Sequence, residues 1–345
     1  MVNTQRDQAH PTLSPVLAPT LVAQAMDLIT PAQRIALLAH ERPDGDALGS
    51  ALGLAHILRQ LGKTCVPACA DPLPHSFQFL PASADLQNSL GDENFDLVIA
   101  LDAGELSRYG ALYERHRAFL DRATILNIDH HVSSNGCGLV NIIDPTAAAT
   151  AELLILFQQQ AGLPLTQEAA LCLLTGLITD TSSFQYSNTT PRTMEAGAAM
   201  LQAGAVAETI AKPIFRTHPL SHMRFMAAVI NTAQTSCNGR LIWSYATEKT
   251  VSDAGAIGNE DDNFSGMLRD IEGVQIAAFF KNYDNNQNTR LSLRSSDPYN
   301  VAEICMKWGG GGHARAAGAT IPLPLAEAIS YVIPILEQAL STPNA

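Results

Sequence analysis

Short apolar runs alternate with stretches of helical spacing through the first two thirds of the sequence. The apolar runs are nearly continuous, as in strands that a parallel sheet buries on both faces, and they cover residues 34–40, 65–70, 97–102 and 124–129. Helical spacing covers residues 21–29, 47–61, 150–161, 168–178 and 191–204, and Thr190 is the expected N-cap of the last stretch. This alternation predicts an α/β domain with a mostly parallel sheet flanked by helices.

The pattern changes after residue 204. A helical stretch broken at Pro213 and Pro219 leads into strands expected at 241–247, 274–283 and 289–295, with an Asn-rich hairpin tip before the last one. Further helices are expected within 254–271 and over 299–308, followed by a glycine run, a strand and a helix. We therefore expect a disordered tail at 1–20, a first domain at 21–204, a linker helix region at 205–226, and a smaller α/β domain at 227–341 across a cleft.

Polar side chains follow the predicted elements of the first domain at the points where they end. In an open parallel α/β sheet, ligands gather at the carboxyl ends of the strands, so these side chains should converge in one crevice. Asp129, His130 and His131 follow one another directly at the end of an apolar strand. The complete set is His40, Asp44, Asp46, Asp102, Asp129, His130, His131 and Asp180.

Carboxylates mixed with imidazoles suit a pair of divalent ions such as Mn²⁺. Two such ions would activate a water to attack phosphorus and would neutralise charge on the phosphate oxygens. Without cations, so many carboxylates in one crevice would repel each other and raise their pKa values. Taken singly, His40 could be a core histidine, and Asp44 and Asp46 could be turn or capping residues. Their joint position at the ends of successive elements favours a site.

The charge and the cysteines limit the class of partner. The net charge is −12, with 33 acidic and 21 basic residues, which argues against a broad basic surface for long nucleic acid but allows a short anionic substrate. No stretch approaches 18 consecutive apolar residues, so we expect no transmembrane helix and no membrane partner. The six scattered cysteines are typical of reduced thiols, and we expect a cytoplasmic protein.

Two sets of motifs resemble a known family. The sequence HERPDGDALGS at 40–50, then Asp102, Asp129-His130-His131 and DTSSF at 180–184 resemble the four motifs of the DHH phosphoesterase superfamily. SLRS at 292–295 and GGGHARAAG at 310–318 resemble its DHHA1 substrate-binding domain. The motifs are in the expected order and span residues 34–321. At this length the chain is most similar to the bacterial nanoRNase (oligoribonuclease) and pAp phosphatase branch.

The resemblance implies roles for the first-domain residues. His40, Asp44 and Asp102 would hold one Mn²⁺, and the second ion would be held by Asp46, Asp102, His130 and Asp180. Asp102 would therefore bridge the ions, and Mg²⁺ or Co²⁺ could replace Mn²⁺. His131 would approach the scissile phosphate or the leaving group, while Asp129 would orient a histidine through its ring N–H. The expected catalytic residues are His131, Asp129 and Asp102.

The resemblance also implies substrate contacts. Arg294 would pair with a substrate phosphate, whose oxygens fit the guanidinium fork. The glycine run would be a loop whose backbone N–H groups approach the nucleotide, with His313 beside it. Arg108 could contact substrate or be a surface arginine. The complete set of expected contacts is Arg294, Ser295, Gly310, Gly311, Gly312, His313 and Arg108.

The implied function is hydrolysis of phosphate esters in very short oligonucleotides, including pApA, to mononucleotides, or of 3′-phosphoadenosine 5′-phosphate (pAp) to AMP. We expect the partners to be short oligonucleotides or mononucleotide bisphosphates, and the assembly to be a homodimer. Three alternatives remain: a family II inorganic pyrophosphatase, a RecJ-like single-strand exonuclease, and a nucleotide-binding regulator on the same fold. A pyrophosphatase would lack the glycine-rich motif with His313, a RecJ-like protein would be longer, and a regulator would lack a metal ligand.

Overall fold

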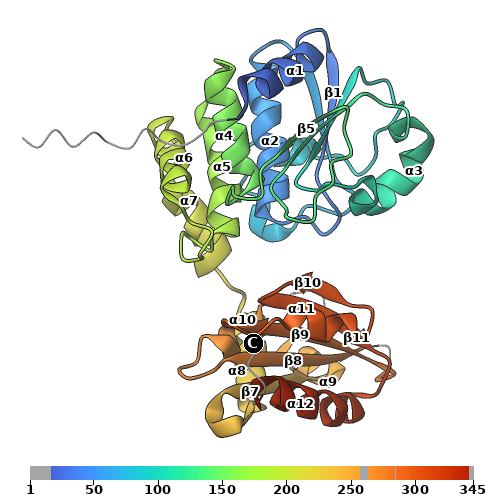
Figure 1. The fold of residues 1–345 in the computed structure, drawn as a ribbon, viewed down its shortest axis with the longest axis vertical. Helices are drawn as coiled ribbons and strands as arrows, with labels where there is room; N and C mark the ends of the chain where they lie inside the picture. The colour runs from blue at the N-terminus through green and yellow to red at the C-terminus, as the bar shows by residue number, and fades with distance from the viewer. Residues whose placement is uncertain (1–16, 257–262, 284, 342–345) are drawn as a thin grey trace, which may run out of the picture. The chain divides into compact units, whose positions relative to one another are not determined.

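The computed structural model describes residues 17–256, 263–283 and 285–341. The chain divides into two compact units between Thr217 and His218, and each unit is described here by itself (Figure 1). This boundary falls inside the stretch 205–226 that we expected to connect two domains. Residues 1–16 of the expected tail lie outside the described residues, and the first helix already begins at Pro19.

The first unit contains a five-stranded sheet in which every neighbouring pair is parallel, as the apolar runs predict. The strand order is β2-β1-β3-β4-β5. The strands are β1 Arg34–Leu38, β2 Thr64–Ala68, β3 Leu97–Leu101, β4 Ile125–Asp129 and β5 Val140–Ile143. The chain leaves β1 toward β2 on one side and later reaches β3 on the other side of β1, so the β1–β3 boundary is the topological switch point.

Helices cover both faces of this sheet, giving the predicted three-layer α/β architecture (Figure 1). One face packs against α1, α2 and α4, α5 packs on α2 and α4, and α6 packs outside α4 and α5. The opposite face packs against α3 through Leu112 and Leu120. The helices of this unit are α1 Pro19–Ile29, α2 Gly45–Arg59, α3 Gly110–Leu120, α4 Thr150–Gln160, α5 Gln167–Asp180, α6 Pro191–Gln202 and α7 Ala207–Ala211. A π-helical turn, Lys212–Arg216, follows α7.

Helices α2 and α5 lie against each other at the closest approach that backbones allow. A Cβ atom at Gly49 of α2 would lie 2.3 Å from the carbonyl oxygen of Cys172 in α5. A Cβ atom at Gly176 of α5 would lie 2.5 Å from the carboxylate Oδ1 of Asp46. The helices run in opposite directions, so the start of α2, with Asp46, lies beside the end of α5, with Asp180.

The second unit contains a six-stranded mixed sheet in the order β10-β11-β9-β8-β7-β6. Only β7 and β8 pair in parallel among its described strands. The strands are β6 Gln234–Ser236, β7 Leu241–Ala246, β8 Ile276–Tyr283, β9 Asn288–Ser295, β10 Gly311–His313 and β11 Ala316–Ile321. The helices are α8 Leu220–Asn231, α9 Glu248–Ala254, α10 Phe264–Arg269, α11 Val301–Met306 and α12 Leu325–Ser341.

The expected glycine loop is in fact an edge strand. Gly311 and Gly312 form β10 with His313, and they pair antiparallel with Gly318 and Ala317 of β11. We expected a loop from the resemblance, and the low strand propensity of glycine agrees with one. Packing nevertheless requires glycine at two positions of the glycine run, because side chains there would not fit. A Cβ atom at Gly310 would lie 2.3 Å from the Gly318 carbonyl oxygen, and one at Gly312 would lie 2.4 Å from the Ala316 carbonyl oxygen.

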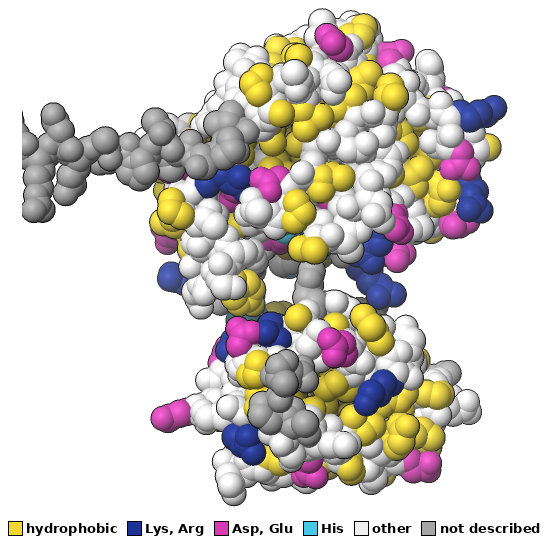
Figure 2. All heavy atoms as spheres, viewed as in Figure 1, with side chains coloured by type: hydrophobic (Ala, Val, Ile, Leu, Met, Phe, Trp, Pro, Cys, Tyr) yellow, Lys and Arg dark blue, Asp and Glu magenta, His cyan; other side chains and the backbone are white. Residues whose placement is uncertain are grey.

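The surface carries charges of both signs. On the face that Figure 2 shows, the Lys and Arg side chains occur in small groups separated by acidic, polar and apolar residues. Among the described residues, no helix combines the length and apolar character that crossing a bilayer requires.

We predict that Gly49→Ala destabilises the first unit, because the added methyl group meets the Cys172 carbonyl oxygen, which is backbone and cannot rotate away. The expected loss is about 1–3 kcal/mol in the free energy of unfolding. Urea unfolding followed by circular dichroism measures it.

Gly197→Ala in α6 is the matched control. A Cβ atom there would lie 3.5 Å from the Phe184 ring, which is ordinary contact, so helix propensity should make this variant neutral or more stable by up to about 1 kcal/mol. Equal stability of the two variants would contradict the proposed packing constraint.

Candidate active site

Three adjacent central strands bring the candidate ligands to one edge of the sheet. His40 follows β1, Asp102 follows β3, and His130 follows Asp129 at the end of β4. His40 and Asp102 thus stand on either side of the β1–β3 switch point, where this topology places a ligand crevice. Asp102 has a φ of 60°, in the left-handed region that few residues other than glycine adopt. Backbone strain of this kind is typical of functional positions.

The expected ligands form two clusters that share Asp102. The Nε2 atom of His40 lies 3.4 Å from Asp102 Oδ2 and 3.7 Å from Asp44 Oδ2. The Nε2 atom of His130 lies 3.5 Å from the other oxygen of Asp102, Oδ1. It also lies 3.2 Å from Asp180 Oδ2 and 3.9 Å from Asp46 Oδ2. Asp102 therefore directs one oxygen toward each cluster, an arrangement that would allow it to bridge two ions.

Hydrogen bonds fix the orientation of the two histidines. The Nδ1 atom of His40 lies 2.8 Å from the Glu41 carbonyl oxygen, and that of His130 lies 3.3 Å from the Ala147 carbonyl oxygen. Because a carbonyl oxygen can only accept, Nδ1 must carry the proton in both rings. The Nε2 atoms then face the carboxylates with a lone pair in the neutral rings. This is how proteins usually orient metal-binding histidines.

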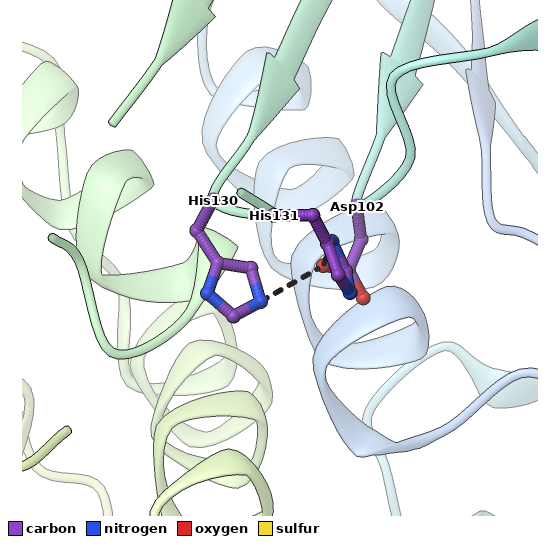
Figure 3. A group of neighbouring side chains, drawn as sticks. All are labelled: Asp102, His130 and His131. Atoms are coloured by element: carbon purple, nitrogen blue, oxygen red, sulfur yellow. Dashed lines mark ion pairs between the residues drawn. The ribbon is translucent and has the colours of Figure 1, made fainter. Parts of the chain in front are cut away.

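His131 is held differently. Figure 3 shows that His130 and His131 follow the same strand and that both rings lie beside Asp102. The Nδ1 atom of His131 is 3.8 Å from Asp102 Oδ1, but it is only 2.7 Å from Asp129 Oδ1 and donates to that carboxylate. The group Asp102, His130 and His131 could geometrically hold an ion, yet the Asp129 contact already occupies the His131 nitrogen that this group would use.

The start of α4 holds the two central carboxylates. The backbone N–H groups of Thr150 and Ala151 donate to Asp46 Oδ2 and Oδ1 at 2.6 and 2.9 Å. The hydroxyl of Thr150 donates to Asp102 Oδ1 at 3.0 Å. The positive end of the α4 dipole thus faces Asp46, which is completely buried. Ser50 adds a third donor to Asp46, at 3.2 Å.

A further layer of contacts fixes the segment before α4. Arg192 of α6 donates to Glu152 Oε1 at 2.5 Å and to Asp144 Oδ2 at 2.8 Å. The side-chain amide of Asn188 donates at 3.1 Å to the carbonyl oxygens of both Ala148 and Asp180. Both contacts tie the 144–152 segment to neighbouring elements. We did not single out Thr150, Asn188 or Arg192 from the sequence, because their roles depend on contacts that span from 8 to 48 residues.

Burial and mutual repulsion shift the pKa values of the acidic groups. Burial raises the pKa of Asp102 well above its ordinary value, and the Asp46 charge adds to the rise. Burial and the Asp46 charge likewise raise the pKa of Asp180 to about 7. Burial raises the pKa of Asp46 too, although the charge on His130 opposes this.

The histidines shift because of the same carboxylates. Burial opposes protonation of His40, but its pairing with Asp102 and Asp44 outweighs burial and raises its pKa to about 11. Burial also opposes protonation of His130, but pairing with Asp180 and the charges of Asp46 and Asp102 raise its pKa to about 10. Without another cation, the site therefore keeps protons on its imidazoles to balance the carboxylates.

Unsatisfied buried atoms show that the donor set fits divalent metal ions. Asp102 Oδ2 and His130 Nε2 are buried and lack an aligned hydrogen-bond partner among the described residues. Each is an atom of a type that can bind a metal ion, and each lies 3.2–3.5 Å from an oppositely charged group without hydrogen-bonding geometry. The ligand atoms of His40, Asp44 and Asp102 lie within 4.8 Å of one another, and so do those of Asp46, His130 and Asp180. Oxygen and imidazole donors at this spacing suit Mn²⁺, Mg²⁺ or Co²⁺ better than metals that prefer thiolate.

The expected substrate residues lie in both units. Arg108 is exposed in the first unit, where its carbonyl oxygen accepts from the Glu41 N–H at 2.9 Å. Arg294 is half-buried on β9. A Cβ atom at Gly311 would meet nothing within 4 Å, so packing does not require glycine there. His313 belongs to β10, and its side chain lies outside the described part of the structure.

Ser295 is already committed to structural contacts. It is buried, its hydroxyl donates to the Tyr299 carbonyl oxygen at 2.6 Å, and its N–H donates to the Arg315 carbonyl oxygen at 3.1 Å. Neighbouring residues in a strand point to opposite faces, so Ser295 faces away from the side that carries Arg294. Its expected substrate contact stays a prediction that this geometry does not favour.

Comparison with known proteins defines the class. Residues 34–177 match the model of the DHH family, N-terminal domain, and residues 240–342 match the DHHA1 domain. The chain belongs to the DHH family with a DHHA1 second domain, and it is a phosphoric ester hydrolase.

Relatives of known name cover nearly the whole chain. The chain is similar to the bifunctional oligoribonuclease and PAP phosphatase NrnA of Thermus thermophilus, with 34% identity over 89% of this chain and 90% of the relative. The protein of the same name from Bacillus subtilis is 27% identical over 83% of this chain and 89% of the relative. The crystal structure of an exopolyphosphatase-related protein from Bacteroides fragilis has a TM-score of 0.86, with 23% identity over 95% of this chain and 98% of that one. That structure supports the fold.

We predict that Thr150→Val weakens Mn²⁺ binding by about 10–100-fold, the usual effect of losing a partner of a metal ligand. The variant keeps the shape of the side chain and the α4 N–H groups but removes the hydroxyl that orients Asp102. Isothermal titration calorimetry of the metal-free protein measures the change.

Thr150→Ser retains the hydroxyl and is the matched control, so its affinity should stay within about threefold of the wild type. Equal Mn²⁺ affinity for the valine and serine variants would show that the hydroxyl does not position Asp102.

We predict that Mn²⁺ affinity rises with pH between about 6 and 8. His40 and His130 have raised pKa values of about 11 and about 10 without metal, so each must release a proton to bind an ion. One proton released per ion corresponds to about a tenfold rise in affinity per pH unit. Calorimetric titrations in two buffers of different ionisation enthalpy count the released protons. Affinity that does not change with pH would contradict this account.

Proposed function

We propose that this protein is a Mn²⁺-dependent phosphoesterase that hydrolyses very short oligonucleotides, such as pApA, to mononucleotides, or pAp to AMP. The observation that carries the proposal is the position of Asp102, whose two oxygens face two separate clusters of carboxylates and histidine. The names of the similar proteins from Thermus thermophilus and Bacillus subtilis support this choice of substrates. Mg²⁺ or Co²⁺ could replace Mn²⁺ at such a donor set.

The first unit would perform the chemistry. One ion would be held by His40, Asp44 and Asp102, and the other by Asp46, Asp102, His130 and Asp180. When bound, such a pair of ions supplies Lewis-acid stabilisation of phosphate charge and lowers the pKa of water. Thr150 and the α4 N–H groups would keep the shared carboxylates in place while substrate enters and product leaves.

His131 and Asp129 would handle the proton of the leaving group. Because Nδ1 of His131 donates to Asp129, Nε2 is the nitrogen that can exchange a proton with a leaving oxygen. Burial works against ionisation of Asp129, but its hydrogen bonds and the charge on His131 together outweigh burial and keep the pKa of the carboxyl below its ordinary value. An ionised Asp129 holds the ring tautomer and stabilises the imidazolium form.

The second unit would bind the nucleotide. Arg294 would pair with a phosphate, and Gly311 would allow close approach of substrate to the β10 backbone. Contacts by Gly310, Gly312, His313 and Arg108 also belong to the proposal. Short substrates agree with the net charge of −12, because long nucleic acid requires many cationic contacts.

A cytoplasmic homodimer is the proposed setting. All six cysteines lie in the described residues as free thiols, as is usual in reducing compartments. A twofold-symmetric homodimer is the commonest assembly of proteins that oligomerise.

We predict that the full chain with Mn²⁺ turns over pApA and pAp, but neither pyrophosphate nor long single-stranded DNA at a comparable rate. Asp102→Asn should lower kcat for both substrates by more than about 100-fold, because it removes a shared ligand rather than a ligand's partner. Product release is followed by chromatography. Turnover of pyrophosphate alone would favour the pyrophosphatase alternative, and nucleotide binding without turnover would favour a regulator.

Asp121→Asn is a control for charge loss. Asp121 is exposed at the end of α3 and contacts Tyr113 rather than the clusters, so its variant should keep wild-type rates. If Asp102→Asn stayed as active as this control, the two-cluster account would be wrong.

A further inference from the structure

Among the described residues, helices cover only part of one face of the second unit's sheet, called here the half-covered face. The opposite face packs Leu291 and Leu293 of β9 against α11 and α12. On the half-covered face, Phe279 of β8 packs against Phe225 of α8 and Phe264 of α10. Beyond Phe279, this face continues across β9 and β11 as a row of residues that are not buried. That row consists of Arg290, Ser292, Arg294, Ala316, Gly318 and Thr320.

Two cations stand directly opposite each other on this face. The antiparallel register pairs Lys281 of β8 with Arg290 of β9. Like charges at directly opposite positions destabilise a sheet. The composition does not force such a pair, because the chain has 33 acidic and only 21 basic residues. The Arg290 side chain is exposed and forms no ion pair or hydrogen bond with other residues that the structure describes. Lys281 Nζ lies 5.9 Å from the centre of the Phe225 ring, and a phosphate bound beside Arg290 would offset the charge of that arginine.

An aromatic ring lies at the same end of the face. Tyr283 is two residues beyond Lys281 on β8, so both side chains point to this face. Tyr283 is 39% exposed, and its hydroxyl donates to Thr320 Oγ1 at 3.5 Å. The register pairs Thr320 with Arg290, so Arg290 is flanked by Lys281 on one side and Thr320 on the other. Cations beside an exposed ring are the features that bind single-stranded nucleotides, through phosphate pairing and base stacking.

We propose that Lys281, Arg290 and Tyr283 form a second nucleotide subsite, which binds a phosphate and base beyond those that Arg294 would contact. Arg294 and Arg290 are four residues apart on one strand, or about 13 Å at about 3.3 Å per residue, which suits two different phosphates of one short chain. The subsite rests on the proposed function, and it adds a means of distinguishing oligonucleotides from pAp, which is too short to occupy it.

Arg290→Gln in the full chain with Mn²⁺ tests the subsite. KM for a 5′-phosphorylated pentaadenylate should rise about tenfold, while kcat and the KM for pAp stay unchanged. The slope of log KM against log salt for the pentanucleotide should fall by about 0.7, the change for one lost contact to a single strand. A rise in KM that is equal for pAp and the pentanucleotide, or no rise for either, would overturn the proposal.

Lys307→Gln is the matched control for charge loss in the same unit. Lys307 caps α11, which packs on the opposite face of the sheet, so its variant should behave as wild type on both substrates. Tyr283→Phe should keep the pentanucleotide KM and Tyr283→Ala should raise it, because only the ring is needed for stacking. An equal rise in KM for Lys307→Gln and Arg290→Gln would show that net charge, and not a specific subsite, determines binding. That result would overturn the proposal.

Binding separates this proposal from the proposed function. Fluorescence anisotropy of a labelled pentaadenylate with metal-free protein needs no turnover. If wild type bound the label about tenfold more tightly than Arg290→Gln but hydrolysed nothing with Mn²⁺, the proposed function would fail and the subsite would stand. If wild type hydrolysed pApA but both proteins bound the label equally, the subsite would fail alone.

Discussion

The burial of several carboxylates beside one another is the constraint on which the first unit depends. Asp46 and Asp102 are almost inaccessible to solvent, and Asp180 lies beside them. Isolated buried charges of one sign are very costly, so the fold must supply positive charge to this point. The imidazoles of His40 and His130 and the N-terminus of α4 supply part of it. The ligand atoms are also close enough together to bind divalent cations, which would supply more.

The rest of the unit keeps these groups from moving apart. Repulsion would be relieved by a small outward shift of α2 or α4, and the packing opposes both movements. Gly49 and Gly176 allow α2 and α5 to approach until backbone meets backbone, which leaves little freedom to Asp46. Arg192 and Asn188 tie the segment before α4 to α6 and to the end of α5. Strain at Asp102, with its left-handed backbone, is tolerated because its neighbours fix it.

The fold class could be predicted from the sequence, and the residues predicted as ligands lie close together in the structure, because both follow from local patterns. Nearly continuous apolar runs identified the parallel strands, and polar residues at strand ends identified His40, Asp102 and His130. The sequence could not identify Thr150 or Arg192, whose roles depend on contacts between distant segments. It also missed β5, whose mixed polar and apolar positions give weak periodicity. For Ser295, strand alternation alone places the side chain on the opposite face from Arg294, so the sequence itself already argued against a shared substrate contact.

Chemistry and selectivity place different demands on a protein, and under the proposed function the two units would meet them with different kinds of surface. A phosphate ester in pAp and one in a longer oligonucleotide present similar atoms to a metal cluster, so a rigid buried site such as that around Asp102 distinguishes them poorly. Discrimination by length requires contacts with parts of the substrate that do not react. The half-covered face that carries Arg290 and Arg294 is suited to such contacts. Arg290 and Arg294 are four residues apart on β9, so the period-two alternation of the strand places both on this face and keeps them out of the apolar core.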